Sequence, residues 1–193
     1  SRALARELGL DDRATADAAL LLAPERPAGA DPNGPVLVVP RAGHPAYNQA
    51  LARLARALRG EGVPVAAVGL HARHDDAEVA ALARTAPGLE ALSARTPDEL
   101  LALLPGASYV VSARLHGCVL AAAAGVGFAA LSYDPKVAGF AALLGAPTFD
   151  APVDDANLLA AATRREPLDL AAREAQVRLA REGLDALVAA LGR

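Results

Sequence analysis

Short apolar runs separated by amphipathic segments constrain the fold of this chain more than any other feature. The run at 36–39 is Val-Leu-Val-Val, and similar runs cover 63–70, 108–112 and 128–132. Because these runs do not alternate with polar residues, they are typical of strands buried on both faces of a parallel sheet. The segment 46–60 instead spaces its leucines three and four residues apart, which predicts an amphipathic helix. The repeated alternation predicts an α/β fold with a doubly wound, mostly parallel, Rossmann-like sheet.

Capping and turn residues predict the remaining elements. Thr96 and Pro97 are residue types favoured at an N-cap and at the first helical position, so a helix is expected to start there. The Pro- and Gly-rich segment 24–35 is the best candidate boundary, and it divides the chain into residues 1–34 and a domain at 35–193. Further helices are expected at 2–9, 75–84, 114–124, 135–144, 154–163 and 167–191, the last packing across the domain, and short strands at 89–93 and 148–153.

Composition excludes several classes of protein. A net charge of −3 and a pI of about 5.8 argue against a nucleic-acid-binding protein, which needs a basic face. The single cysteine excludes a disulfide framework and a cysteine-rich zinc site. No apolar run approaches the length of about 18 residues that a transmembrane helix needs, and no signal peptide opens the chain. These features predict a cytoplasmic protein, with any membrane association limited to a peripheral one at the inner face.

Ligands of doubly wound sheets bind at the carboxyl ends of the strands. The segments that directly follow predicted strands are therefore the first candidates for a site, and they cover 41–44, 71–76, 112–116 and 133–136. Two of these segments, 112–116 and 133–136, carry side chains that suit an anionic ligand.

Arg114, Leu115 and His116 lie where a strand passes into a helix. The free N–H groups of a helix N-terminus attract anions, and an arginine adds a bidentate donor. His116 is suited to hydrogen-bond the same anion or to transfer a proton near neutral pH. The alternative is a structural role for both, with the arginine in an ion pair and the histidine packed. Gly117 is expected to permit close packing of the helix on the strand.

Asp134 and Lys136 occupy a second strand-to-helix passage, with Pro135 between them. Asp134 is a plausible N-cap for the helix. Lys136 is the single lysine among 19 basic residues, and it lies in a first helical turn, where the helix dipole does not favour a cation. An ammonium group is thus either required there for its chemistry or simply solvated. Arg41 follows the first strand of the domain and is expected to reach the same crevice.

Other possible sites give weaker signals. His71, His74, Asp75 and Asp76 are spaced only loosely like metal ligands, and with no second cluster in the sequence no metal site is predicted. Cys118 is expected to be a small buried hydrophobic residue. Neither a nucleophile elbow nor a Gly-x-Gly-x-x-Gly loop follows any predicted strand.

The segments Ser112-Ala113-Arg114-Leu115-His116-Gly117 and Ser132-Tyr133-Asp134-Pro135-Lys136-Val137 together resemble the polysaccharide pyruvyltransferases. The similarity is greatest to the bacterial cell-wall type, which adds a pyruvate ketal to a polymer containing N-acetylmannosamine, of the kind that anchors surface layers. It extends to Val39-Pro40-Arg41 and covers most of residues 1–145. The family has a two-domain GT-B fold, so the resemblance implies that 35–193 is the C-terminal, donor-binding domain and that 1–34 is a linker and a remnant of the N-terminal domain.

The resemblance also implies a reaction and its residues. Pyruvate is transferred as a ketal from phosphoenolpyruvate to a sugar or a lipid-linked oligosaccharide, without a metal or another cofactor. His116 and Lys136 are the implied catalytic residues. The implied substrate-binding residues are Arg41, Arg114, Leu115 and Asp134. The acceptor is expected to bind the missing N-terminal domain, so the chain alone is expected to be inactive.

Two alternatives stay open from the sequence. One is half of a GT-B glycosyltransferase or sugar epimerase that binds a nucleotide-sugar, because the same helix N-termini would hold a diphosphate. The other is a module that binds anions without catalysis.

Overall fold

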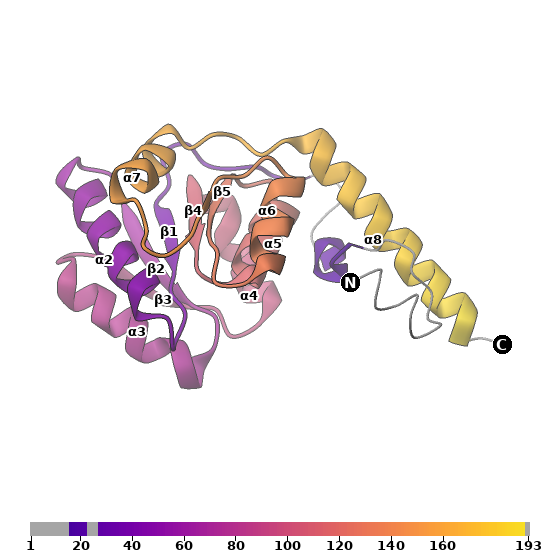
Figure 1. Cartoon of the computed structure of the whole chain (residues 1–193), viewed down its shortest axis with the longest axis horizontal. Helices are drawn as coiled ribbons and strands as arrows, with labels where there is room; N and C mark the ends of the chain where they lie inside the picture. The colour runs from indigo at the N-terminus through magenta and orange to yellow at the C-terminus, as the bar shows by residue number, and fades with distance from the viewer. Residues whose placement is uncertain (1–15, 23–26, 192–193) are drawn as a thin grey trace.

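A single parallel sheet organises the protein in the computed structural model, which describes residues 16–22 and 27–191 (Figure 1). The six strands are ordered β3-β2-β1-β4-β5-β6, and every paired neighbour is parallel. The predicted doubly wound parallel fold is thereby confirmed. The strands are β1 (Val36–Val39), β2 (Val65–Gly69), β3 (Glu90–Ser93), β4 (Tyr109–Ser112), β5 (Phe128–Leu131) and β6 (Thr148–Phe149).

The burial of the strands follows their position in the sheet. All residues of β1, β2, β4 and β5 are buried, as their continuous apolar sequences predict. The edge strand β3 is largely exposed. The other edge strand, β6, has two residues instead of the six expected at 148–153. Pro152 contributes to this difference because it has no N–H to donate to a strand ladder.

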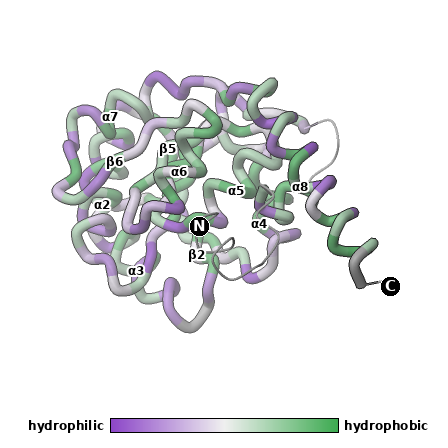
Figure 2. The backbone as a smooth tube through the Cα atoms, turned by 45° about the vertical axis from the view of Figure 1, so that its right-hand side comes forward, coloured by the Kyte–Doolittle hydropathy of each residue, from purple (hydrophilic) through white to green (hydrophobic). Residues whose placement is uncertain are grey.

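Helices cover both faces of the sheet and enclose two apolar cores. Figure 2 shows hydrophobic residues concentrated in the inner strands and in the helices packed on them. The face with the side chains of Val36 and Val38 packs against α2 (Pro45–Gly60), α3 (Ala72–Thr85) and α7 (Asp155–Arg164). The face with Leu37 and Val39 packs against α4 (Pro97–Leu103), α5 (Leu115–Ala123), α6 (Pro135–Leu143) and the short 3₁₀ segments η1 (Ala18–Leu22) and η2 (Leu104–Gly106).

Two helix starts differ from the sequence prediction by three residues, each for an identifiable reason. Helix α3 begins at Ala72, three residues before the predicted start, because the carboxylate of Asp75 accepts the main-chain N–H of His71 and so completes the first turn. Helix α8 (Leu170–Leu191) begins three residues later than predicted, after Asp169, whose carboxylate accepts the N–H of Ala172 at 3.0 Å. The helix predicted at 2–9 lies outside the described residues.

Helix α8 does not pack across the domain as expected. Its first half lies along η1 and the end of α5, where buried Arg173 donates to the main-chain carbonyls of Ala122 and Ala123. Burial lowers the pKa of Arg173. The second half runs away from the sheet and exposes Leu187 and Val188 (Figure 1). Within the described part of the chain, no helix is long and apolar enough to cross a membrane.

The close contact between α5 and β4 depends on Gly117, as predicted. A β-carbon at this position would overlap the Ser112 hydroxyl, lie 3.1 Å from Ser112 Cβ and lie 3.5 Å from a methyl group of Val39. The Ser112 hydroxyl is not free to move, because it accepts the N–H of Arg114 and donates to the carbonyl of the same residue.

We expect Gly117→Ala to lower the free energy of unfolding by about 1–3 kcal/mol, the usual cost of overpacking a core. Gly139→Ala is the matched control. Gly139 lies in helix α6 with open space around it, so alanine there is expected to stabilise the protein by about 0.5–1 kcal/mol. Urea unfolding of the two variants measures both values. Equal stability of Gly117→Ala and the unsubstituted protein would contradict the packing argument.

Candidate functional site

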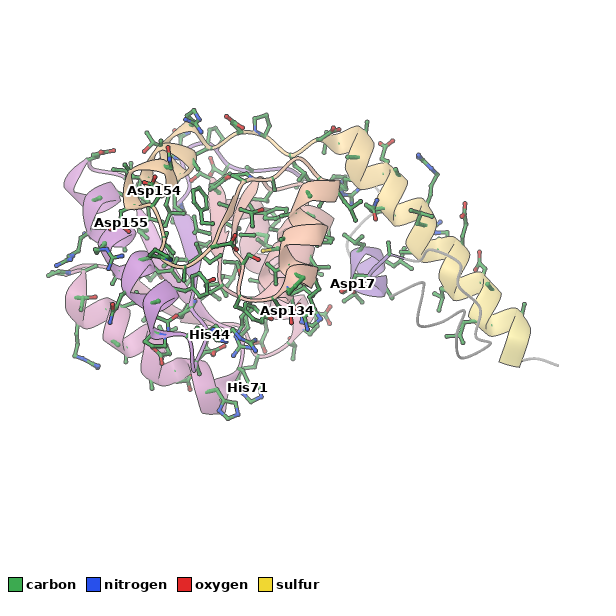
Figure 3. All side chains as sticks on the ribbon, in the orientation of Figure 1. Asp17, His44, His71, Asp134, Asp154 and Asp155 are labelled. Carbon is green, nitrogen blue, oxygen red and sulfur yellow. The ribbon has the colours of Figure 1, made fainter. Side chains whose placement is uncertain are left out.

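A cavity of about 470 Å³ opens at the carboxyl ends of the strands. It lies at the switch point of the sheet, where β1 and β4 are neighbours but continue into helices on opposite faces. Figure 3 labels His44, His71 and Asp134 along this edge of the domain. The cavity brings together five residues predicted from the sequence: Arg41, Arg114, Leu115, His116 and Lys136. It is also lined by Ala19, Leu70, His71, Ala94, Arg95, Thr96, Pro97, Leu100, Leu120 and Tyr133.

Asp75 connects three of the loops that form the cavity. Its side chain is fully buried, and Oδ1 accepts the N–H of Ala42 and a guanidinium N–H of Arg114 at 2.5 Å. Oδ2 accepts the N–H groups of Leu70 and His71. One carboxylate therefore holds the segments that follow β1, β2 and β4. From the sequence, Asp75 is predicted to start a helix and is grouped with weak metal ligands, and its role as the partner of Arg114 is not predicted.

Arg114 is held in place at two points. It is the N-cap residue of α5, and its main chain is fixed by the Ser112 hydroxyl. Its guanidinium is fixed by Asp75, and the side chain is 19% exposed. The ion pair considered as a structural role in the sequence analysis is thus present. However, Nε of Arg114 is buried without a hydrogen-bond partner, so the ion pair with Asp75 leaves part of the donor capacity of the guanidinium unsatisfied.

Arg41 is held without the use of its side-chain donors. The side-chain amide of Asn48 accepts the N–H of Arg41 at 3.1 Å and donates to its carbonyl at 2.9 Å, which fixes the main chain. The guanidinium lies over the ring of Tyr133, 4.1 Å from its centroid. Nε of Arg41 is also buried without a partner. Neither Asn48 nor Tyr133 is predicted from the sequence as a site residue, although Tyr133 lies in the candidate segment 133–136.

His44 extends the aromatic contacts around Tyr133. Its ring lies 4.9 Å from the Tyr133 ring, between centroids. Desolvation lowers the pKa of His44, and the positive charges of Arg41 and Arg114 lower it further. The two guanidinium groups are therefore close enough to His44 to disfavour its protonated form. A ligand with negative charge would offset this electrostatic cost.

His116 and Lys136 are exposed residues in the first turns of α5 and α6. Asp134 caps α6 by accepting the N–H of Lys136, as predicted, and its other oxygen lies 3.8 Å from Lys136 Nζ. Asp134 is not among the residues that line the cavity. Its assignment to the substrate stays a prediction, and in this structure its carboxylate acts on the helix and on the lysine.

The residues that gave weaker signals of a site make ordinary structural contacts. The rings of His71 and His74 are 4.5 Å apart, and Asp75 is engaged by Arg114. Across 16–22 and 27–191 there is no group of three or more His, Cys, Asp or Glu residues arranged to hold a metal ion. Cys118 is buried as expected, and burial raises the pKa of its thiol to about 12.

The chemistry that this arrangement supports is binding of a compact polyanion. Three arginines, two histidines and one lysine line the cavity, and no described residue of the lining is acidic. The lining also has aliphatic side chains, which include Leu70, Leu100 and Leu115. Charge-assisted hydrogen bonds to a carboxylate or phosphate are strong in such a setting.

Comparison with known proteins agrees with the fold and the motifs. The family model described as polysaccharide pyruvyl transferase matches residues 1–135. The crystal structure of CalG4, the calicheamicin glycosyltransferase, is similar with a TM-score of 0.51 and 22% identity, over 84% of this chain and 43% of that one. MurG of Acinetobacter baumannii has a TM-score of 0.52 and 16% identity, over 86% of this chain and 51% of that one. None of the curated proteins compared with the sequence matches it.

These solved structures have GT-B folds, and their similarity confirms the Rossmann-like domain type that the sequence predicted. The chain spans about half the length of each of them. At this level of identity the similarity shows the fold alone.

We expect Asp75→Ala to lower the free energy of unfolding by about 3–5 kcal/mol, because it leaves a largely buried guanidinium without its counter-charge. Asp76→Ala is the control. Asp76 forms a 3.8 Å ion pair with Arg95 in which both side chains are more than half exposed, and its loss is expected to cost less than about 1 kcal/mol. Denaturant unfolding distinguishes the two residues. A similar small loss for both variants would show that Asp75 does not organise the site.

Proposed function

Because the chain belongs to the polysaccharide pyruvyl transferase family, we propose that its cavity binds phosphoenolpyruvate and serves in the transfer of pyruvate as a ketal to a sugar. The observation that carries the proposal is the pair of arginines at the switch point. Arg41 and Arg114 come from neighbouring strands, and each has a buried Nε without a partner. Buried donors without partners are costly, so their presence in one cavity favours an anionic ligand there.

Phosphoenolpyruvate carries a carboxylate and a phosphate on a three-carbon body. Arg41, whose guanidinium is held only by the face of Tyr133 among the described contacts, has its donors available for bidentate binding of one of these anions. Arg114 and the N-terminus of α5 bind the other anion. Leu115 contributes an apolar surface beside the methylene carbon.

His116 is the proposed proton donor. It lies in the first turn of α5, next to the arginine that holds the donor substrate. Histidine is the side chain best suited to exchange a proton near neutral pH. Transfer of a proton to the methylene carbon of phosphoenolpyruvate produces a methyl group and an oxocarbenium-like centre at the neighbouring carbon.

Two acceptor hydroxyls complete the ketal. The first forms a carbon–oxygen bond to the cationic centre and loses its proton, giving a tetrahedral adduct that still carries phosphate. The bond to the phosphate oxygen then breaks, and the second hydroxyl adds to the same carbon and releases its proton. Of the two protons released by the hydroxyls, one replaces the proton donated by His116 and the other leaves with inorganic phosphate.

Lys136 is proposed to neutralise the departing phosphate. Its ammonium group is a compact charge in the first turn of α6, on the same cavity as Arg114 and His116. Asp134 lies beside this ammonium and holds the first turn of the helix, so it acts on the substrate through Lys136.

The acceptor is proposed to be an N-acetylmannosamine residue of a cell-wall polysaccharide precursor, either a free sugar or a lipid-linked oligosaccharide. In this proposal the donor occupies the cavity of the present domain. The acceptor binds a second, N-terminal domain and reaches the donor from there. In this proposal residues 1–34 belong to that domain and its linker, residues 35–193 form the donor-binding domain, and the reaction takes place in the cytoplasm. The 193-residue chain alone then binds the donor without turning it over.

Calorimetric titration of the chain with phosphoenolpyruvate tests the donor assignment. We expect binding that Arg41→Ala and Tyr133→Leu both weaken, by about tenfold to a hundredfold for Arg41→Ala, since hydrogen bonds to charged groups contribute about 1.5–3 kcal/mol. Tyr133→Phe keeps the aromatic face and is expected to retain affinity. Arg56→Ala is the control, because Arg56 is an exposed residue of α2 outside the cavity. Tight binding of a UDP-sugar with no response to phosphoenolpyruvate would overturn the proposal in favour of a nucleotide-sugar enzyme.

The catalytic roles are tested in the natural full-length protein. We expect His116→Ala and Lys136→Ala to lower pyruvyl transfer by about two orders of magnitude or more, the range of general acid catalysis, while phosphoenolpyruvate still binds. Lys136→Arg preserves the charge and is expected to retain part of the activity. Formation of pyruvylated polymer is the readout. Undiminished activity of the two alanine variants would show that both residues are structural.

A further inference from the structure

A second cavity shares an unusual property with the first. Of the side chains that the structure describes, four have a buried nitrogen or oxygen atom without a hydrogen-bond partner. Arg41 and Arg114 account for two of them, in the cavity described above. Ser108 Oγ and Arg165 Nε are the other two, and both residues line one further cavity of about 480 Å³.

This second cavity lies at the opposite end of the sheet. Its walls come from the segment that precedes β1, from the residues directly before β4 and β5, and from the connection between α7 and α8. Figure 1 shows this connection along the edge of the domain opposite the edge where Figure 3 labels His44 and His71. No residue lines both cavities. The lining consists of Gly29, Ala30, Pro32, Ser108, Gly125, Gly127, Arg164, Arg165, Pro167, Leu168 and Leu170.

Ser108 has a polar group that the folded protein leaves without a partner. The residue is 4% exposed, its main-chain N–H donates to the carbonyl of Pro35, and its hydroxyl has no partner. A buried hydroxyl of this kind lowers stability relative to alanine. Rotation about a single bond is enough to redirect the hydroxyl, so a molecule in the cavity is able to supply the partner.

Arg165 is also unfavourable for the stability of the free domain. It directly follows α7 with a φ of 49°, the left-handed conformation that glycine or asparagine adopts at helix ends with less strain. One guanidinium nitrogen donates to the carbonyl of Pro32 at 3.1 Å, which holds the group at the cavity, and Nε stays unpartnered. Glycine would adopt this backbone conformation with less strain, so the position combines a strained main chain with an incompletely paired guanidinium.

The charge of the cavity defines the class of ligand. Arg164 is compensated by Glu166 at 3.1 Å, whereas Arg165 has no acidic partner among the described contacts. None of the lining residues that the structure describes is acidic, and Pro167, Leu168 and Leu170 provide apolar walls. We propose that this cavity is a second ligand site, which binds a small organic molecule carrying a phosphate or carboxylate group.

The proposal explains why two residues that destabilise the free domain lie in the same cavity. Functional sites commonly retain groups that lower stability, because the ligand supplies the missing interactions. The same relation holds for Arg41 and Arg114 in the first cavity. The second site does not depend on the transfer reaction, because it has no residue in common with the donor site.

A nuclear magnetic resonance titration of the ¹⁵N-labelled chain with phenyl phosphate separates the two sites in one experiment. The main-chain amides of Gly125 and Gly127 report on the second cavity, and those of Gly43 and Gly117 report on the first. We expect the amides of Gly125 and Gly127 to shift in a saturable manner. A parallel titration with benzoate distinguishes a preference for phosphate from a preference for carboxylate, and saturable shifts with either probe support the site.

Arg165→Gly removes the guanidinium and relieves the backbone strain, so it is the decisive variant. We expect it to weaken probe binding at Gly125 and Gly127 at least tenfold, to leave the shifts at Gly43 and Gly117 unchanged, and to melt at a higher temperature without the probe. Arg165→Asn, which also tolerates the left-handed conformation, serves if the glycine variant does not fold. Arg178→Ala, an exposed substitution on α8, is the control for loss of one positive charge.

Two results would overturn the proposal. One is the absence of shifts at Gly125 and Gly127 at probe concentrations that saturate the first cavity. The other is probe binding that Arg165→Gly and Arg165→Asn leave unchanged. Ser108→Ala gives an independent measurement, since it is expected to raise the melting temperature of the free chain and to weaken binding of the probe. A lower melting temperature with unchanged binding would assign Ser108 to the fold alone.

Discussion

The site depends on the hydrogen bonds and the ion pair that the buried carboxylate of Asp75 makes. It accepts hydrogen bonds from the segments after β1, β2 and β4, and it neutralises the guanidinium of Arg114. A buried charge of this kind is stable only when its hydrogen bonds and counter-charge are complete. The hydrogen bonds of Asp75 therefore hold the three loops together at the carboxyl end of the sheet. The same carboxylate fixes the position of the Arg114 side chain.

Local hydrogen bonds and an aromatic contact at the strand ends complete the positioning of the site residues. Ser112 and Ser132 each donate to a main-chain carbonyl two residues further on, which shapes the turns that lead to Arg114 and Asp134. Asn48 fixes the main chain of Arg41, and Tyr133 supports its guanidinium. Because these contacts are made before any ligand enters, the donors are preorganised and binding loses less side-chain entropy.

The two cavities lie at opposite ends of the sheet, and both are lined by residues with buried polar atoms that have no hydrogen-bond partner. In each, the fold leaves buried polar side-chain atoms without partners in the free domain, and the described lining contains arginines but no acidic residue. Such groups lower stability, and the rest of the domain compensates through two well-packed cores on the faces of the sheet. Residues of the segments that resemble the family line the first cavity. No motif identified in the sequence contributes to the lining of the second.

The sequence by itself determined the order and type of the elements in the described domain and the strand ends that surround the first cavity. The continuous apolar strands, the helical periodicity and the motifs around Arg114 and Lys136 are local signals, and the parallel topology brings their carboxyl ends to one edge. Only the tertiary structure decided that Asp75 is the partner of Arg114, that Asn48 and Tyr133 hold Arg41, and that Ser108 and Arg165 meet in a second cavity. These contacts join residues from separate elements, 57 apart in the last case, and their energies depend on burial, which local sequence patterns do not specify.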